Sequence, residues 1–161
     1  MKKMTLFIVT MLIAYQAQAQ AGLEFKSTYQ DWERYEAETA TPGERVVIGV
    51  TEAKAKHKEQ VKTVALRCTY DGVNLLFFKS LARNESSYNA RSSIDDGAPF
   101  YMDVALKGTT HWATLPNNQL DNARAGAQLR VVLSGDDSKE SVVVSLLGFT
   151  KMYAAVSSGC Q

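Results

Sequence analysis

The two cysteines, Cys68 and Cys160, are the residues with the clearest chemical potential in this 161-residue chain. Redox-active cysteines usually stand close together, as in a C-x-x-C motif at the start of a helix, and this motif does not occur. In an oxidising compartment, two distant cysteines predict one structural disulfide, for which chain entropy gives roughly 4–5 kcal/mol of stabilisation. We therefore expect a Cys68–Cys160 disulfide, with a redox pair as the alternative.

The histidines offer little for metal chemistry. The chain contains two of them, His57 and His111. Once both cysteines form a disulfide, too few nitrogen and sulfur donors remain for a four-ligand zinc site. His57 also stands among lysines, which repel a cation. With no phosphate-binding glycine loop in the sequence either, we expect no metal and no cofactor.

Hydrolytic chemistry would need groups that the sequence does not bring together. The G-x-S-x-G turn of many serine hydrolases does not occur. Two adjacent acidic pairs exist, Asp95–Asp96 and Asp136–Asp137, and each stands beside a glycine. Aspartates in such positions form turns by bonding nearby backbone, whereas a glycosidase needs two acids across a cleft. We expect both pairs to be turn residues, and the protein not to be an enzyme.

Residues 1–19 have the three regions of a secretory signal peptide. A basic head precedes an apolar run of about twelve residues, and Ala17-Gln18-Ala19 is a small-x-small cleavage site. The run is too short to span a membrane, which takes about 20 residues. We expect cleavage after Ala19, a single domain over residues 20–161 with no membrane span, and a periplasmic location, with secretion as the alternative.

The charge balance argues against nucleic acid as a partner. The chain has 18 Lys+Arg and 17 Asp+Glu, and loss of Lys2 and Lys3 with the signal peptide would leave a net charge near −1. Such a protein has no overall field that attracts nucleic acid. One local bias exists, a lysine cluster within Lys54–Lys62. It predicts either a solvated loop or a contact with anionic envelope polymers.

Short segments rich in β-branched and aromatic residues alternate with turn signals through most of the chain. The clearest turn is Asp71-Gly72, which predicts a hairpin between its two flanking segments. Residues 21–29 have little pattern and are expected to form a loose arm. Expected strands cover residues 32–36, 45–51, 63–69, 73–78, 88–92, 100–106, 111–114, 128–134 and 141–147, and a short helix covers 119–125.

The last segment changes from strand to helix periodicity. Apolar residues recur at helical spacing from Phe149 to Cys160, between the helix-breaking Gly148 and Gly159. Short strands with frequent turns are typical of an antiparallel sandwich or a closed sheet. We predict a mainly β fold, an antiparallel β-sandwich whose C-terminal helix is tied to the sheet by the disulfide.

Two strands carry apolar residues on both faces, at Phe77-Phe78 and Tyr101-Met102. Burial on both sides of the sheet explains this pattern, and a protein-binding face explains it equally well. The sequence leaves both interpretations open.

The order of several short motifs is characteristic. A tryptophan strand is followed by a strand that ends in Arg-Cys, a hairpin turn, an Ile-Asp-Asp-Gly-x-Pro turn, a second tryptophan strand and an apolar strand, and then by a Gly-Phe helix with a terminal cysteine. The positions are Trp32, Arg67–Cys68, Asp71–Gly72, Ile94–Pro99, Trp112, Leu129–Leu133 and Gly148–Cys160. This order resembles the small periplasmic proteins associated with type VI secretion gene clusters and, more loosely, the invasion-associated locus B family of secreted β-rich proteins. The resemblance implies a non-enzymatic periplasmic accessory protein with a β-sandwich core, and it supplies no catalytic residues.

The expected function is therefore that of an accessory or binding protein of the bacterial envelope, whose partner is an envelope or secretion-system protein. The alternative is a periplasmic inhibitor of lysozyme or another cell-wall hydrolase. Such an inhibitor presents a loop to the cleft of the enzyme. The candidate binding residues for either role are Ile94, Asp95, Asp96, Gly97 and Pro99. The sequence leaves the oligomeric state open.

Overall fold

The computed structural model describes residues 22–55, 63–78 and 81–160 of the chain. The signal peptide predicted over residues 1–19 lies outside the described residues, as do His57 and most of the lysine cluster. The strands are β1 (Glu24–Tyr29), β2 (Trp32–Glu38), β3 (Arg45–Ala55), β4 (Thr63–Thr69), β5 (Gly72–Phe78), β6 (Asn89–Ile94), β7 (Phe100–Lys107), β8 (Thr110–Leu115), β9 (Gln128–Ser134) and β10 (Lys139–Ser145). The helical segments are η1 (Asn117–Gln119), α1 (Leu120–Ala125), α2 (Phe149–Val156) and η2 (Ser157–Cys160).

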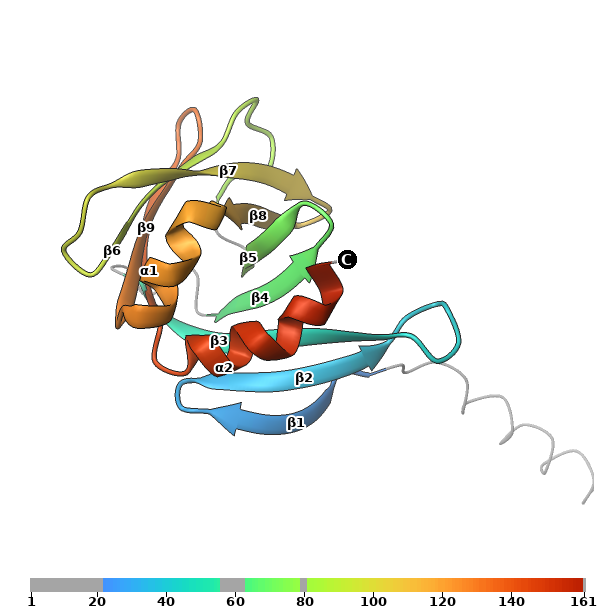
Figure 1. The fold of residues 1–161 in the computed structure, drawn as a ribbon. Coiled ribbons are helices and arrows are strands. Elements are labelled where there is room, and N and C mark those ends of the chain that lie inside the picture. Colours follow the sequence, from blue (N-terminus) through green and yellow to red (C-terminus); the bar gives the residue numbers. More distant parts are fainter. Residues whose placement is uncertain (1–21, 56–62, 79–80, 161) are drawn as a thin grey trace, which may run out of the picture.

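Eight of these strands close into an antiparallel barrel (Figure 1). The order around the barrel is β3-β10-β9-β6-β7-β8-β5-β4, and β4 pairs with β3 again to close it. Strands β1 and β2 extend the sheet outward from β3. The predicted β-sandwich is therefore wrong, although the mainly β, antiparallel class is confirmed. Sandwich and barrel share the same alternation along each strand, and only long-range pairings such as β3–β10 distinguish them.

The long strand β3 makes this closure possible because it pairs with three different strands. Arg45–Val50 pairs with β2, Gly49–Glu52 pairs with β4, and Ala53–Ala55 pairs with β10. One edge of β3 thus pairs with β2 along its first part and with β10 along its last part. On this edge of β3, β2 and β10 diverge from each other, and a groove forms between them.

Side chains that face inward fill the barrel. Leu66, Leu75, Phe77 and Val131 come from three different strands, and each is at most 1% exposed. Small barrels of eight strands have an interior just wide enough to be packed by side chains. The inward side chains of the described strands thus form the hydrophobic core of the protein.

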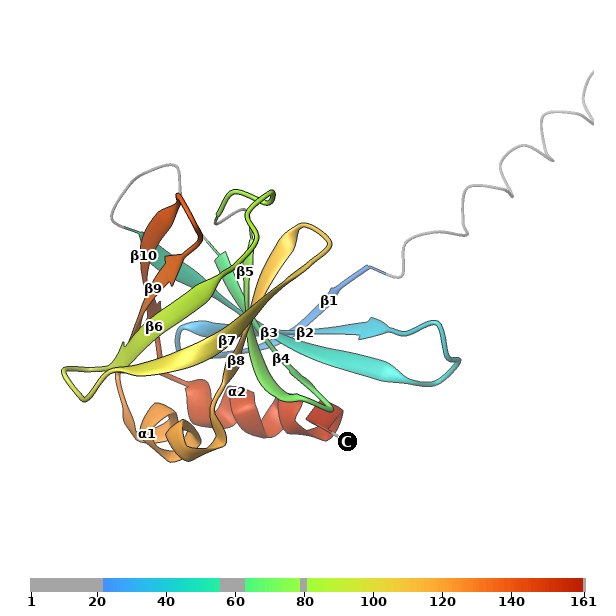
Figure 2. The ribbon, with the colours of Figure 1, turned by 90° about the horizontal axis from the view of Figure 1, so that it is seen from above.

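Both α-helices lie across one end of the barrel (Figures 1 and 2). Helix α2 buries Phe149 and Met152, and the Phe149 ring meets the Trp32 ring edge-on at 6.1 Å. Gly49 of β3 lets α2 approach closely, because a Cβ at this position would stand 2.5 Å from Cγ of Met152. The predicted C-terminal helix is confirmed. Among the residues that the structure describes, no helix is long and apolar enough to cross a membrane.

The predicted disulfide is also confirmed. Cys68 of β4 and Cys160 of η2 are bonded, with Cα atoms 4.8 Å apart and 92 positions between them in the sequence. The final turn lies directly on β4, because a Cβ at Gly159 would stand 2.9 Å from the carbonyl oxygen of Cys68. The bridge therefore ties the C-terminus of the chain to the barrel wall.

Candidate functional site

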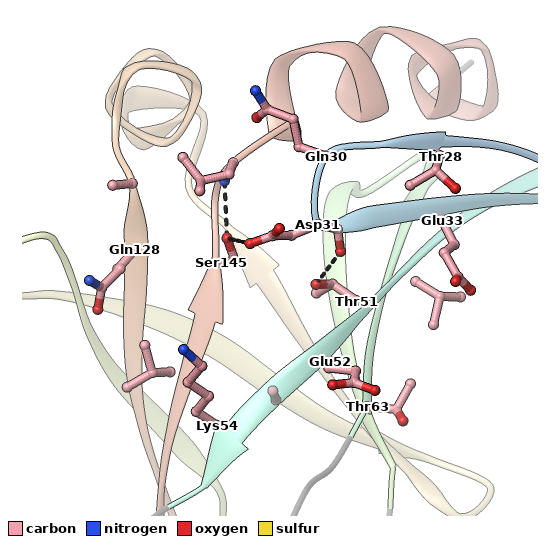
Figure 3. A pocket seen from close by; sticks show the side chains of 15 residues that line it. Thr28, Gln30, Asp31, Glu33, Thr51, Glu52, Lys54, Thr63, Gln128 and Ser145 are labelled. Carbon is pink, nitrogen blue, oxygen red and sulfur yellow. Dashed lines mark hydrogen bonds between the residues drawn. The ribbon is translucent and has the colours of Figure 1, made fainter.

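A groove of about 760 Å³ opens where the edge of β3 passes from β2 to β10 (Figure 3). The turn between β1 and β2 forms one side of the groove, and the ends of β9 and β10 form the other. Its lining residues are Thr28, Gln30, Asp31, Glu33, Val50, Thr51, Glu52, Ala53, Lys54, Thr63, Ala127, Gln128, Val143, Ser145 and Leu147. Most of them are polar.

Asp31 fixes the two sides of the groove to each other. Its carboxylate accepts a hydrogen bond of 2.6 Å from the Ser145 hydroxyl, and its carbonyl oxygen accepts one of 2.7 Å from the Thr51 hydroxyl (Figure 3). The indole N–H of the neighbouring Trp32 donates to the carbonyl oxygen of Ser145 at 3.0 Å. The shape of the groove is therefore fixed by hydrogen bonds between its two sides, and the Asp31 carboxylate takes part in one of them.

The charged groups of the groove are mainly acidic. Asp31 and Glu33 belong to the β1–β2 hairpin, whereas Glu52 and Lys54 both come from β3 (Figure 3). A set of three or more His, Cys, Asp or Glu side chains able to hold a metal ion is not found in the described parts of the chain. Three carboxylates and one ammonium suit a basic side chain of a binding partner.

The predicted binding segment Ile94–Pro99 forms the turn between β6 and β7. Asp95 adopts a positive φ of 49° there, and its carboxylate accepts hydrogen bonds from the backbone N–H groups of Ala127 at 3.1 Å and Gln128 at 2.9 Å. The Asp95 N–H in turn donates to the carbonyl oxygen of Gln128 at 2.9 Å. This aspartate is thus engaged in locking the turn onto the start of β9.

The other members of the predicted segment divide into buried and exposed residues. Ile94 is 9% exposed and belongs to the core. Asp96, Gly97 and Pro99 are exposed, and the Gly97 N–H closes the turn by donating to the carbonyl oxygen of Ile94 at 2.9 Å. A hollow of about 450 Å³ separates this turn from α1. The structure therefore presents the 96–99 tip to solvent on a fixed base.

The second acidic pair has a similar structural role. The Asp136 carboxylate accepts hydrogen bonds from the N–H and hydroxyl of Ser86 at 2.7 and 2.8 Å, and from the Ser87 hydroxyl at 2.6 Å. The hydroxyls of Ser87 and Ser86 favour the charged form and lower the pKa of Asp136 to about 2. Asp136 thus ties the β9–β10 turn to the segment before β6.

His111 lies inside the barrel rather than at the surface. It is fully buried, and its ring meets the Tyr88 ring edge-on at 4.6 Å. Burial, and then the positive charge of Arg83, lower the pKa of His111 below its usual value. His111 is thus a core residue of β8 that packs against Tyr88.

In each of the two apolar pairs, one residue faces the core and the other faces outward. Phe77 and Met102 point into the core, whereas Phe78 is 41% and Tyr101 is 65% exposed on the outer face. On the same outer face, Lys107 Nζ stands 4.5 Å from the centroid of the Trp112 ring, and Arg67 Cζ stands 5.9 Å from it. The outward members of both pairs are therefore available for contact with a partner.

The fold has a known counterpart. A solved structure, described as the crystal structure of invasion associated protein B from Bartonella henselae, superposes with a TM-score of 0.57 at 17% sequence identity. The match covers 82% of this chain and 94% of that chain. The two proteins share a fold. The sequence matches no protein-family model and no curated protein. The likeness to invasion associated protein B agrees with the looser of the two sequence resemblances, and the resemblance to type VI secretion proteins is not shown.

Proposed function

We propose that this chain is an exported, non-enzymatic accessory protein of the bacterial envelope that binds another protein through a turn held rigid on a filled β-barrel. The observation that carries the proposal is the locked Ile94–Pro99 turn, whose Asp95 carboxylate bonds the backbone of Ala127 and Gln128. A turn that is fixed before binding loses little conformational entropy when a partner covers it. The exposed Asp96 and Pro99 at its tip are then the contact residues.

Three further observations support this proposal. The barrel interior is filled, which leaves the outer surface for binding. Of the side chains considered for catalysis, Asp95 and Asp136 are hydrogen-bonded to neighbouring turns and His111 is buried. The fold is shared with a protein named as invasion associated, and the signal peptide and disulfide expected from the sequence fit a periplasmic location.

Site-specific photo-cross-linking in the native periplasm tests the proposal. A photoreactive residue at Ala98, in the exposed tip, should give a discrete adduct with one envelope protein. The same residue at Thr41, in the exposed turn between β2 and β3, is the matched control and should not give it. Asp95→Ala should weaken the adduct because it frees the base of the turn. Equal labelling from both positions would contradict the proposal.

More specifically, we propose that the protein associates with a type VI secretion apparatus. It rests on the sequence resemblance carried by Arg67–Cys68 and by Gly148–Cys160. The adduct from Ala98 should then contain a component of that apparatus, and deletion of the gene should reduce secretion of its effectors. Normal effector secretion by the deletion strain would exclude this form and leave the general binding role standing.

A second candidate function is inhibition of lysozyme or another cell-wall hydrolase. The same locked turn favours it, because rigid exposed loops suit insertion into an enzyme cleft. A turbidity assay tests it directly: excess mature protein should slow lysis, and Asp96→Ala should weaken the inhibition. Undiminished lysis by several lysozymes would exclude the inhibitor role.

A further inference from the structure

Strands β1 and β2 and the first part of β3 (Arg45–Val50) stand out from the barrel as a three-stranded sheet, which we call the wing (Figures 1 and 2). Helix α2 packs against one face of the wing, the face to which Trp32 and Gly49 belong. Residues that alternate with Trp32 and Gly49 along their strands point to the opposite side. The wing therefore has a second face that α2 does not cover.

This second face of the wing is apolar. We call it the outer wing face, and it consists of Phe25, Tyr35, Ala37, Val46, Ile48 and Val50. Directly paired residues of neighbouring strands share a face, so Phe25 and Ile48 stand on either side of Tyr35. The rings of Phe25 and Tyr35 meet edge-on at 5.7 Å. Phe25 is 52% exposed and the other five residues are half-buried, so the surface is open to a partner.

The ion pairs of β2 and β3 in the wing lie on the side of α2. The paired residues alternate with the outer wing face, and they are Arg34, Glu36, Glu38 and Arg45. In an antiparallel sheet with one covered face, the solvated face is normally the polar one. The wing has the reverse pattern. An exposed apolar surface rimmed by polar groups is typical of a site that another protein covers.

The outer wing face leads directly into the acidic groove. The side chains of β3 on this side follow one another at steps of about 6.6 Å, and they are Val46, Ile48, Val50, Glu52 and Lys54. Val50 and its partner Glu33 already line the groove, and Glu52 lies beyond them (Figure 3). Both glutamates are exposed. An apolar strip about 13 Å long is thus followed by two carboxylates.

We propose that the outer wing face and the acidic groove together bind one amphipathic helix of a partner protein. The apolar side chains of this helix cover the outer wing face, and a Lys or Arg about one turn beyond them reaches Glu33 and Glu52. Residues four apart on a helix are about 6 Å apart along its axis, which matches the steps of β3. About 13 residues of helix span the roughly 20 Å from Val46 to Glu52.

The size and charge of the surface favour a single helix over a second copy of this chain. Three strands about 4.8 Å apart, with about five residues each, give a face of roughly 14 by 17 Å. This area is far below the roughly 800 Å² per partner of a standard interface, but it accommodates a helix about 10 Å wide. The outer wing face also has no basic side chain that could pair with Glu33 and Glu52 of a second copy.

The opposite face of the wing provides a precedent within the same molecule. There the amphipathic helix α2 buries Phe149 and Met152 against the sheet. A partner helix on the outer wing face would complete a sheet with helices on both faces, which is a common layered arrangement. The outer wing face and the 96–99 tip are different surfaces, so either can bind a partner without the other.

Photo-cross-linking of the full chain in its native periplasm tests this site. A photoreactive residue at Val46, at the rim of the outer wing face, should give one discrete adduct. Mass spectrometry of the adduct should identify a partner segment with apolar residues three or four apart and a Lys or Arg beyond them. The same photoreactive residue at Glu38, which is exposed on the α2 side of the wing, is the matched control and should not give the adduct.

Charge reversal tests the groove with the purified, disulfide-bonded protein. A synthetic peptide of the cross-linked segment is the probe, and fluorescence anisotropy measures its Kd. Glu52→Lys should raise the Kd about tenfold or more because like charges then meet. Asp103→Lys makes the same change on the exposed face of β7 and should leave the Kd unchanged. A peptide with Glu in place of its Lys or Arg should bind Glu52→Lys more tightly than the wild-type protein, and misfolded protein cannot give this recovery.

Several results would overturn the proposal. Equal adducts from positions 46 and 38, or no adduct from position 46, would show that the outer wing face is not a binding site. An adduct of two copies of this chain would replace the helix by a dimer. A cross-linked segment without the apolar spacing and the basic residue, or a Kd that Glu52→Lys leaves unchanged, would contradict the role of the groove.

Discussion

Removal of the disulfide should destabilise the fold strongly while leaving its core packed. The perturbation is the double variant Cys68→Ala/Cys160→Ala, which keeps an apolar side chain at the 3%-exposed position 68. With 92 positions between the cysteines, the chain-entropy model gives about 4.6 kcal/mol of lost stabilisation. Domains of this size are stable by about 5–15 kcal/mol, so the loss is a third or more of the total.

Urea unfolding followed by circular dichroism measures this loss. With a slope of about 2 kcal/mol per molar urea, the midpoint should move down by roughly 2 M. Wild-type protein under reducing conditions is the matched control and should unfold at nearly the same midpoint as the double variant. Hydrogen exchange should also rise in η2 and at the edge of β4 that η2 covers. A loss below about 1 kcal/mol would refute the reasoning, because the bridge would then not restrict the unfolded chain.

Three other positions give independent tests. Gly49→Ala should cost about 1–3 kcal/mol in chemical denaturation, since the added methyl meets Met152, and Met152→Ala should recover part of this cost in the double variant. Asp95→Ala should cost about 1–2 kcal/mol by removing the hydrogen bonds to the start of β9, whereas Asp96→Ala should stay within about 0.5 kcal/mol. Burial lowers the pKa of His111 from 6.5, so below that pH the unfolded chain binds a proton that the folded chain does not. The free energy of unfolding should therefore fall through His111 as the pH drops below 6.5, and His111→Gln should remove this part of the pH dependence. A pH profile unchanged by His111→Gln would contradict the assignment.

Local signals in the sequence predicted most of the individual elements. The Asp71-Gly72 turn correctly gives the β4–β5 hairpin, because a turn of this type leaves few alternatives for its flanking strands. The change of periodicity after Gly148 correctly gives α2. Strand β1 was missed because its alternation is broken: a bulge between Phe25 and Ser27 shifts the register of its pairing with β2. The loose arm expected at residues 21–29 is therefore wrong.

The closed barrel could not be predicted in the same way. Closure depends on β3 pairing with β2, β4 and β10, and no local pattern in Arg45–Ala55 indicates three partners. The groove was missed for a related reason, since the bond from Ser145 to Asp31 joins residues 114 positions apart. The tight β1–β2 turn beside the groove gives no clear local signal either, because Gln30 adopts a positive φ of 56° where Gly, Asn or Asp is usual. The Ile94–Pro99 turn was recognised, but its anchor at Ala127 and Gln128 was beyond the reach of sequence patterns.

The three-way pairing of β3 has a consequence for the order in which the protein folds. During synthesis the N-terminus emerges first. The contacts of β1 with β2, of β2 with β3 and of β4 with β5 can therefore form early, because the paired strands are close in sequence. The β3–β10 contact joins Lys54 to Val143, so the last part of β3 has no partner on that edge until almost the entire chain has emerged. Contacts of such sequence separation form slowly, because a long loop must first close. The barrel is thus completed at the end of folding, and the Cys68–Cys160 disulfide can form on β4 only at this late stage.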